Sequence, residues 1–218
     1  AGTSNFRAGV NAGNSIESGG NYNVAIGDEA GTAITTGDNN TAIGFAALDA
    51  NTTASNNTAV GYNSLTANTT GTDNTAVGVN TLALNVTTGR NTAIGDNALA
   101  ANIASDNTAV GREALTANTS GVENIAIGRN ALDTNTTGNS DVAIGMKAMD
   151  ANTTGSDNVG IGAYSLDANT TGSDNVAIGK HSLGANTTAS NNTAVGDGAM
   201  AANTTGTQNA ALGALSLD

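Results

Sequence analysis

The sequence has no cysteine, no proline and no tryptophan among its 218 residues. The absence of cysteine excludes disulfides and cysteine-ligated metal sites. The absence of proline suits a chain of many stacked strands, because each proline removes a hydrogen bond from a sheet ladder. Aromatic residues make up 2% of the chain and charged residues 11%. These values indicate neither an ordinary aromatic core nor a highly charged disordered chain.

Positive charge is scarce, since the net charge is −12 and only six side chains are Lys or Arg. The six are scattered, so a nucleic-acid-binding surface is not expected; they are Arg7, Arg90, Arg112, Arg129, Lys147 and Lys180. The sequence contains no signal peptide and no apolar run long enough to span a membrane. It begins within a divergent repeat, which indicates a mature product or a fragment of a longer protein.

An internal repeat dominates the sequence. The phrase Asn-Thr-Ala-Val/Ile-Gly recurs every seventeen residues, with a single step of sixteen between Asn91 and Asn107. A weaker copy starts at Asn5, eighteen residues before Asn23. Written as positions 1 to 17, the unit is N-T-A-V-G-x-x-A-L-x-A-N-T-T-G-x-x. The sequence therefore predicts one repeat domain over 1–218, with a divergent first coil at 1–22 and regular repeats over 23–218.

The residue types within the unit predict a strand at positions 2 to 5 and a turn at Asn-Thr-Thr-Gly. A period of seventeen is too short for a helix pair and suits one coil of a parallel β-solenoid. We therefore predict an all-β solenoid of about twelve to thirteen coils. The missing residue falls in Ile103–Asp106 and the shifted Gly89 lies in the same stretch, where a turn can absorb length changes.

The alternation of a strand assigns positions 2 and 4 to one face and position 3 to the other. We expect the Val or Ile at position 4 to line the core, with Val60, Val77, Ile94 and Val110 in one internal column. Position 9 holds Leu or Met and should fill the core from the opposite wall. The Asn columns at positions 1 and 12 should stack as amide ladders.

Position 3 is almost always Ala, which predicts that another backbone comes close there. The predicted core is thin for seventeen ordered residues per coil. We therefore expect a homo-oligomer whose chains meet through the alanine face near Ala59, Ala76 and Ala93.

The repeat resembles the YadA-like, haemagglutinin-type heads of trimeric autotransporter adhesins, and related repeats occur in phage tail-fibre-like proteins. The residues that carry the resemblance are units such as Asn57-Thr58-Ala59-Val60-Gly61 and Asn175-Val176-Ala177-Ile178-Gly179. The resemblance implies a left-handed parallel β-roll, three chains around one axis, and exposure on a bacterial surface. The family's usual period is nearer fourteen, so each coil here is about three residues longer. The neck, stalk and membrane anchor of a complete adhesin are not in this sequence.

The candidate sites have ordinary structural interpretations. His181, the only histidine, should be an exposed turn residue without catalytic or metal-binding partners. The stretch from Gly172 to Lys180 has the wrong glycine spacing for a phosphate loop. Acidic residues recur at positions 10 and 17 and could recruit calcium, but Asn, Thr and Ala interrupt both columns. The triplets at Asn51, Asn118 and Asn169 match glycosylation sequons, which the repeat itself explains.

The sequence therefore assigns no catalytic, cofactor-binding or metal-ligating residue, and it leaves the ligand-binding residues unknown. We expect no enzyme and no cofactor. We expect an adhesin head or fibre segment that binds host or matrix ligands through a repetitive face, on a bacterial cell surface (outer membrane) or in a virion fibre. The alternative is an ice-binding solenoid that uses the threonines at positions 13 and 14, although these ranks are broken at Val86 and at Ile103-Ala104.

Overall fold

The computed structural model describes residues 4–17 and 19–217, which form strands and turns and no helix. Two compact units, residues 1–106 and 107–218, divide the chain. The strands of the first unit are β1 (Phe6–Ala8), β2 (Val24–Ile26), β3 (Thr41–Ile43), β4 (Thr58–Val60), β5 (Thr75–Val77) and β6 (Thr92–Ile94). Those of the second unit are β7 (Thr108–Val110), β8 (Ile125–Ile127), β9 (Val142–Ile144), β10 (Val159–Ile161), β11 (Val176–Ile178), β12 (Thr193–Val195) and β13 (Ala210–Leu212).

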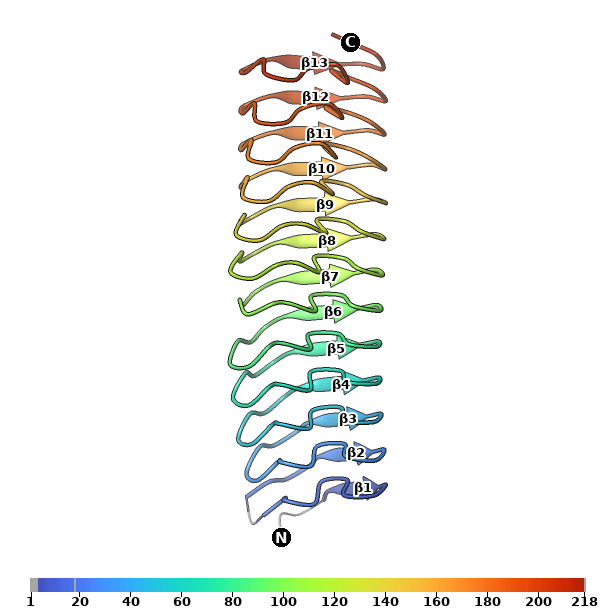
Figure 1. The fold of residues 1–218 in the computed structure, drawn as a ribbon, viewed down its shortest axis with the longest axis vertical. Coiled ribbons are helices and arrows are strands. Elements are labelled where there is room, and N and C mark those ends of the chain that lie inside the picture. The colour runs from blue at the N-terminus through green and yellow to red at the C-terminus, as the bar shows by residue number, and fades with distance from the viewer. Residues whose placement is uncertain (1–3, 18, 218) are drawn as a thin grey trace. The chain divides into compact units, whose positions relative to one another are not determined.

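Within each unit every strand pairs in parallel with the next one along the chain (Figure 1). The register follows the repeat, so that Val60 of β4 pairs with Ile43 of β3 and with Val77 of β5. Even the divergent first coil keeps this register, because Phe6 of β1 pairs with Val24 of β2. Each coil is one strand followed by two turn segments, which confirms the predicted parallel β-solenoid with coils of about seventeen residues.

The prediction for the two faces of the strand is wrong. The alanines at position 3, including Ala59, Ala76 and Ala93, are fully buried inside the coil of their own chain. The Val and Ile side chains at position 4 lie on the outside instead; Val60, Val77 and Val110 are half-buried and Ile94 is 40% exposed. The alanine face therefore cannot be the surface through which chains meet.

The width of the coil explains this inversion. The side chains at position 9, such as Leu65 and Leu82, are fully buried and cross the interior toward the strand, as predicted. A long side chain from one wall leaves room only for a methyl group on the other. At the one glycine of the alanine column, a Cβ built on Gly160 would lie 2.8 Å from Cγ of Met149. Here the larger Met149 side chain occupies the space that an alanine methyl takes in other coils.

Two ladders of amide side chains complete the core and confirm the prediction for the Asn columns. At position 12, Nδ2 of Asn68 donates to Oδ1 of Asn51 one coil earlier at 3.0 Å, and to the Gly71 carbonyl at 2.9 Å. At position 1, the backbone N of Asn74 donates to Oδ1 of Asn57 at 3.0 Å. Among the described residues, no buried side-chain nitrogen or oxygen lacks a partner. The interior therefore combines one leucine layer with two polar ladders.

The turns require left-handed backbone at residues that are not glycine. Leu65 has φ of 53° although its side chain is fully buried, and the same conformation recurs at position 9 of other coils. Gly61, at the end of β4, has φ of 138°, and a Cβ there would collide with the Gly78 carbonyl of the next coil. Left-handed leucines are costly, so the regular hydrogen bonds to adjacent coils must hold these turns in place.

Candidate functional surfaces

His181 and the stretch from Gly172 to Lys180 adjoin one another in the chain, in β11 and the turns on either side of it. His181 is exposed, as predicted, and its ring stacks on Tyr164 with centroids 5.2 Å apart. Between Gly172 and Lys180 lies β11, and Lys180 is an exposed residue after that strand rather than the start of a helix. Within the part of the chain that the structure describes, no group of three His, Cys, Asp or Glu residues could hold a metal ion.

The acidic columns are tied into the turns by neighbouring side chains. At position 17, Asp106 accepts from Arg90 at 2.6 Å, and this hydrogen bond lowers the pKa of the carboxyl. At position 10, partial burial raises the pKa of Asp133 and Asp167. These carboxylates are partly buried and do not converge on one point. They therefore form a packed edge of the coil and not a ladder of ion ligands.

The glycosylation sequons at position 12 are part of the core. Asn51, Asn118 and Asn169 are fully buried. Their Nδ2 atoms, to which a glycan would be attached, donate to the carbonyls of Ala54, Gly121 and Gly172 at 2.9 to 3.1 Å. These three sequons therefore serve the amide ladder, in agreement with their structural interpretation.

The strand exposes an apolar face along each unit. We call the side chains at positions 2 and 4 the outer sheet face. In the second unit it carries aliphatic β-branched residues at both positions in four successive strands, β8 to β11. Ile125, Ile127 and Ile178 are each more than a third exposed, and Leu212 of β13 is 83% exposed. The outer sheet face therefore presents a continuous row of aliphatic side chains over β8 to β11.

The turn that follows the strand, at positions 6 and 7, differs between the two units. In the first unit it carries exposed apolar side chains in three successive coils, Phe45, Tyr62 and Val79, and the two aromatic rings stack with centroids 5.5 Å apart. In the second unit it carries the four basic residues of that unit and the histidine: Arg112, Arg129, Lys147, Lys180 and His181. Sequence reasoning treated these positions only as variable and missed this segregation.

The basic residues of this turn have acidic neighbours. Arg112 pairs with Glu113 and Lys147 with Asp150, both at 3.0 Å. These hydrogen bonds lower the pKa of Glu113 and raise that of Lys147. Because carboxylates pair with two of the four basic residues, the turn does not present a continuous positive surface to a polyanionic ligand.

The threonines form a second regular surface. At position 14 the second unit exposes one threonine in each of five successive coils: Thr137, Thr154, Thr171, Thr188 and Thr205. At position 13 the threonines are mostly half-buried, and Oγ1 of Thr153 donates to the Thr170 carbonyl of the next coil at 2.9 Å. Each coil therefore offers one freely exposed threonine, as expected from the sequence.

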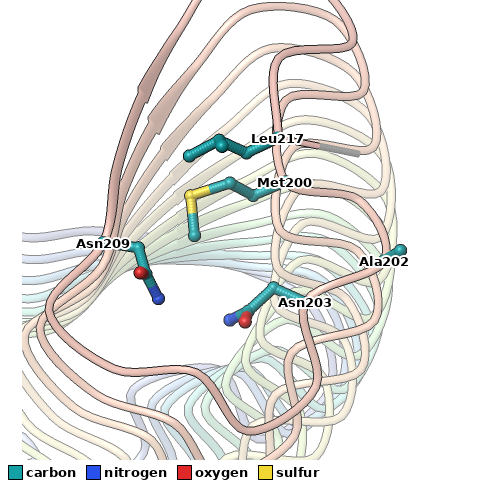
Figure 2. A pocket seen from close by; sticks show the side chains of 5 residues that line it. All are labelled: Met200, Ala202, Asn203, Asn209 and Leu217. Atoms are coloured by element: carbon teal, nitrogen blue, oxygen red, sulfur yellow. The ribbon is translucent and has the colours of Figure 1, made fainter.

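A hollow of about 250 Å³ lies at the last described coil, lined by Met200, Ala202, Asn203, Asn209 and Leu217. Figure 2 shows Met200 and Leu217 pointing into the interior, with the amide groups of Asn203 and Asn209 beside them. Apart from Ala202, these residues belong to the columns that fill the core of the inner coils. The hollow is therefore the interior of the stack seen at its open face, and it holds no charged or nucleophilic group.

No family model, curated protein or solved structure matches this chain. The relation to trimeric adhesin heads therefore rests on the residues of the repeat. Among the described residues, no helix has the length and hydrophobicity needed to cross a membrane.

Proposed function

We propose that this chain is an adhesin head or fibre segment, outside the cell on a bacterial surface or in a virion fibre. Three copies associate through their outer sheet faces and leave the turns exposed for ligands of host or matrix origin. The number of chains and a left-handed winding come from the resemblance of the repeat. The solenoid fold and its regular surface come from the structure.

The outer sheet face is the observation that carries the proposal. Ile127 of β8 and Ile178 of β11 are each more than a third exposed, and the Val and Ile side chains of β9 and β10 between them are half-buried. Coils repeat about every 4.8 Å along a parallel stack, so a partner matches them all only if it has the same spacing. Another copy of this chain has that spacing by construction. Burying the remaining area of one such side chain contributes about 1 kcal/mol, and the contributions add along the stack.

The turns supply the proposed ligand surface. Side chains at positions 6 and 14 are largely exposed in successive coils, and those at position 7 are mostly half-buried. A repetitive surface can bind through many weak contacts whose effects combine by avidity. This arrangement fits an extended ligand better than a small molecule, because the exposed side chains are spread over successive coils.

The test is the mass of the protein in solution, measured by light scattering. We expect a trimer, and we expect Ile127→Asp to shift it toward monomer because the carboxylate would be buried between copies. Thr137→Asp is the matched control: it adds the same charge on an exposed residue of another face and should leave the mass unchanged. A wild-type protein that is monomeric at high micromolar concentration would contradict the proposed assembly. A panel of immobilised matrix proteins and glycans then tests adhesion.

Ice binding remains the second candidate, and the unbroken threonine rank from Thr137 to Thr205 favours it. Regularly spaced hydroxyl and methyl groups on a rigid face could order water. Thermal hysteresis of the purified protein tests this candidate directly. Hysteresis that is lost in Thr171→Tyr, in the middle of the rank, would support ice binding in place of adhesion. Thr70→Tyr, in the first unit, is the control.

A further inference from the structure

One residue departs from the Asn column at position 1. Asp141 stands where the neighbouring coils have Asn124 and Asn158, and it is fully buried like them. A buried carboxyl group in a ladder of amides changes the supply of hydrogen-bond donors, since an amide has two N–H donors and a carboxylate has none.

The usual coil shows what this position requires. Nδ2 of the Asn donates to the carbonyl fourteen residues later, as in Asn124 to Gly138 at 2.8 Å and Asn158 to Gly172 at 3.0 Å. Its Oδ1 accepts from the backbone N of the next coil, as in Asn158 to Asn175 at 3.1 Å. One side chain thus closes its own coil and joins it to the next.

Asp141 keeps the acceptor half of this pattern. Its Oδ1 accepts from the backbone N of Asn158 at 2.9 Å and from Asn158 Nδ2 at 3.1 Å. Its Oδ2 therefore occupies the place of the missing Nδ2. A Cβ built on Gly138 would lie 2.9 Å from Oδ2, the same distance that separates a Cβ on Gly121 from Nδ2 of Asn124.

The donor half is missing when the carboxyl group is ionised. The carbonyl fourteen residues after Asp141 belongs to Gly155, and Nδ2 of Asn152 donates to it at 2.9 Å and to Oδ2 of Asp141 at 3.0 Å. In other coils the equivalent carbonyl receives two amides; Gly71 accepts from both Asn57 and Asn68. Gly155 would instead face a negatively charged oxygen.

We propose that Asp141 is protonated in the folded protein and that its hydroxyl donates to the Gly155 carbonyl. Ionisation of Asp141 breaks this hydrogen bond and destabilises the second unit at this coil. A protonated carboxyl group has one O–H, which takes the place of the N–H that an amide donates to this carbonyl. The contact between Asp141 and Gly155 is therefore sensitive to pH and is most stable in acid.

The electrostatic surroundings agree with this assignment. Burial raises the pKa of Asp141 from 3.8 to about 7, and the negative charge of Asp157 in the same coil adds to the rise. Glu123 is also acidic and directly precedes Asn124 of the preceding coil. The cations of the preceding coil and of this coil, Arg129 and Lys147, belong to the turn after the strand. No positive charge near Asp141 favours its ionised form.

The sign of the pH dependence follows from linkage. The folded state holds the proton up to about pH 7, whereas the unfolded chain releases it near pH 4. The stabilisation is therefore complete below about pH 4 and decreases as the pH rises to about 7. The opposite dependence holds for a carboxylate that gains a cationic partner on folding.

The experiment compares wild type with Asp141→Asn in thermal unfolding between pH 4 and pH 8. We expect the two midpoints to be similar at pH 4, and the wild-type midpoint to lie several degrees lower at pH 8. Asp157→Asn removes the same charge from the coil edge and should not reproduce this difference. Asn192→Asp places a carboxyl group at the same position of another coil. It should create a second pH-sensitive hydrogen bond, and stability should again decrease as the pH rises.

A direct titration removes any dependence on how the variants fold. The carboxyl carbon signal that is lost in Asp141→Asn should titrate near pH 7 in the folded wild-type protein. A midpoint below pH 5, or parallel unfolding profiles for wild type and Asp141→Asn, would overturn the proposal.

Discussion

The two units have the same kind of interior and differ on the outside. The interior columns hold the same residue types in both units. The coils of β4 and β5 in the first unit, and those of β8 and β9 in the second, have Ala at position 3, Leu or Met at position 9 and Asn at position 12. On the outer sheet face, β3 to β6 carry Thr at position 2, whereas β8 to β11 carry Val or Ile. The turn at positions 6 and 7 carries the apolar run Phe45, Tyr62 and Val79 only in the first unit, and basic residues only in the second.

This difference separates two kinds of constraint. Each inner column is bounded by its own chain and by the coils before and after it, so its residue must fit at every repeat. Each outer column is bounded only by solvent or by a partner. The comparison teaches that the interior of this solenoid specifies the fold, and that its outer columns are where function can vary.

The alanine column should be the most sensitive part of both units. Ala76→Phe and Ala143→Phe place a ring where only a methyl group fits, opposite the buried position 9 side chains. We expect each to lower the free energy of unfolding by about 3 kcal/mol or more, measured by urea denaturation. Val77→Phe and Ile144→Phe are the controls, because these residues lie on the outer sheet face and should cost little. Equal losses for Ala76→Phe and Val77→Phe would show that the faces have been assigned the wrong way round.

The amide ladder should come next. Asn68→Ala in the first unit and Asn169→Ala in the second each remove a donor from a buried Oδ1, that of Asn51 or of Asn152. A loss of about 1 to 3 kcal/mol is expected from the unsatisfied groups, with the same size in both units. Thr70→Ala and Thr171→Ala, on exposed residues of the same turn, should stay within about 0.5 kcal/mol of wild type. A much larger loss of stability in one unit than in the other would contradict the view that the two units have the same kind of interior.

The smallest effects should come from exchanging the outer residues. Thr58→Ile gives β4 the outer sheet face of the second unit, and Ile125→Thr gives β8 that of the first. We expect the first change to strengthen association and the second to weaken it, each by about 1 kcal/mol or less per copy, measured by sedimentation equilibrium. If both variants changed the strength of association in the same direction, association would not depend on the outer sheet face.

Much of the fold was predictable because the repeat aligns residues of equal role. Gly61, Leu65 and their equivalents recur at a constant spacing along the chain. This spacing predicted the coil, the strand and the leucine column that faces the strand across the interior. The alternation along the strand also separated two faces, but it could not decide which one points inward. Hydrophobicity favoured Val60, whereas the width left by Leu65 admits only Ala59.

A signal for the correct face was present in the sequence. The inner column tolerates almost no change in size, while the outer one accepts Thr58 and Val176 at the same position. The single Gly160 occurs one coil after Met149, which is a large residue at a position that is usually Leu. The left-handed turns were not predictable, because Leu65 and Leu82 adopt a conformation that leucine rarely takes.

The candidate surfaces were less predictable than the fold. Phe45 and Tyr62 are seventeen residues apart, so their stacking follows once the coil is known. The hydrogen bonds of Asp141 depend on the carbonyl of Gly155, which no sequence pattern identifies. What a free surface binds depends on a partner that the chain itself does not encode.

The fit of Met149 against the space at Gly160 also bears on how the chain finds its register during folding. In a perfect repeat, a coil that skipped its neighbour and paired with the following coil would find the same residues in register, and only the contacts of the skipped coil would be lost. A slipped pairing would put Met149 against an alanine and leave a void at Gly160. Irregular residues of this kind act as alignment marks, since they make one stacking order better than its near-identical competitors.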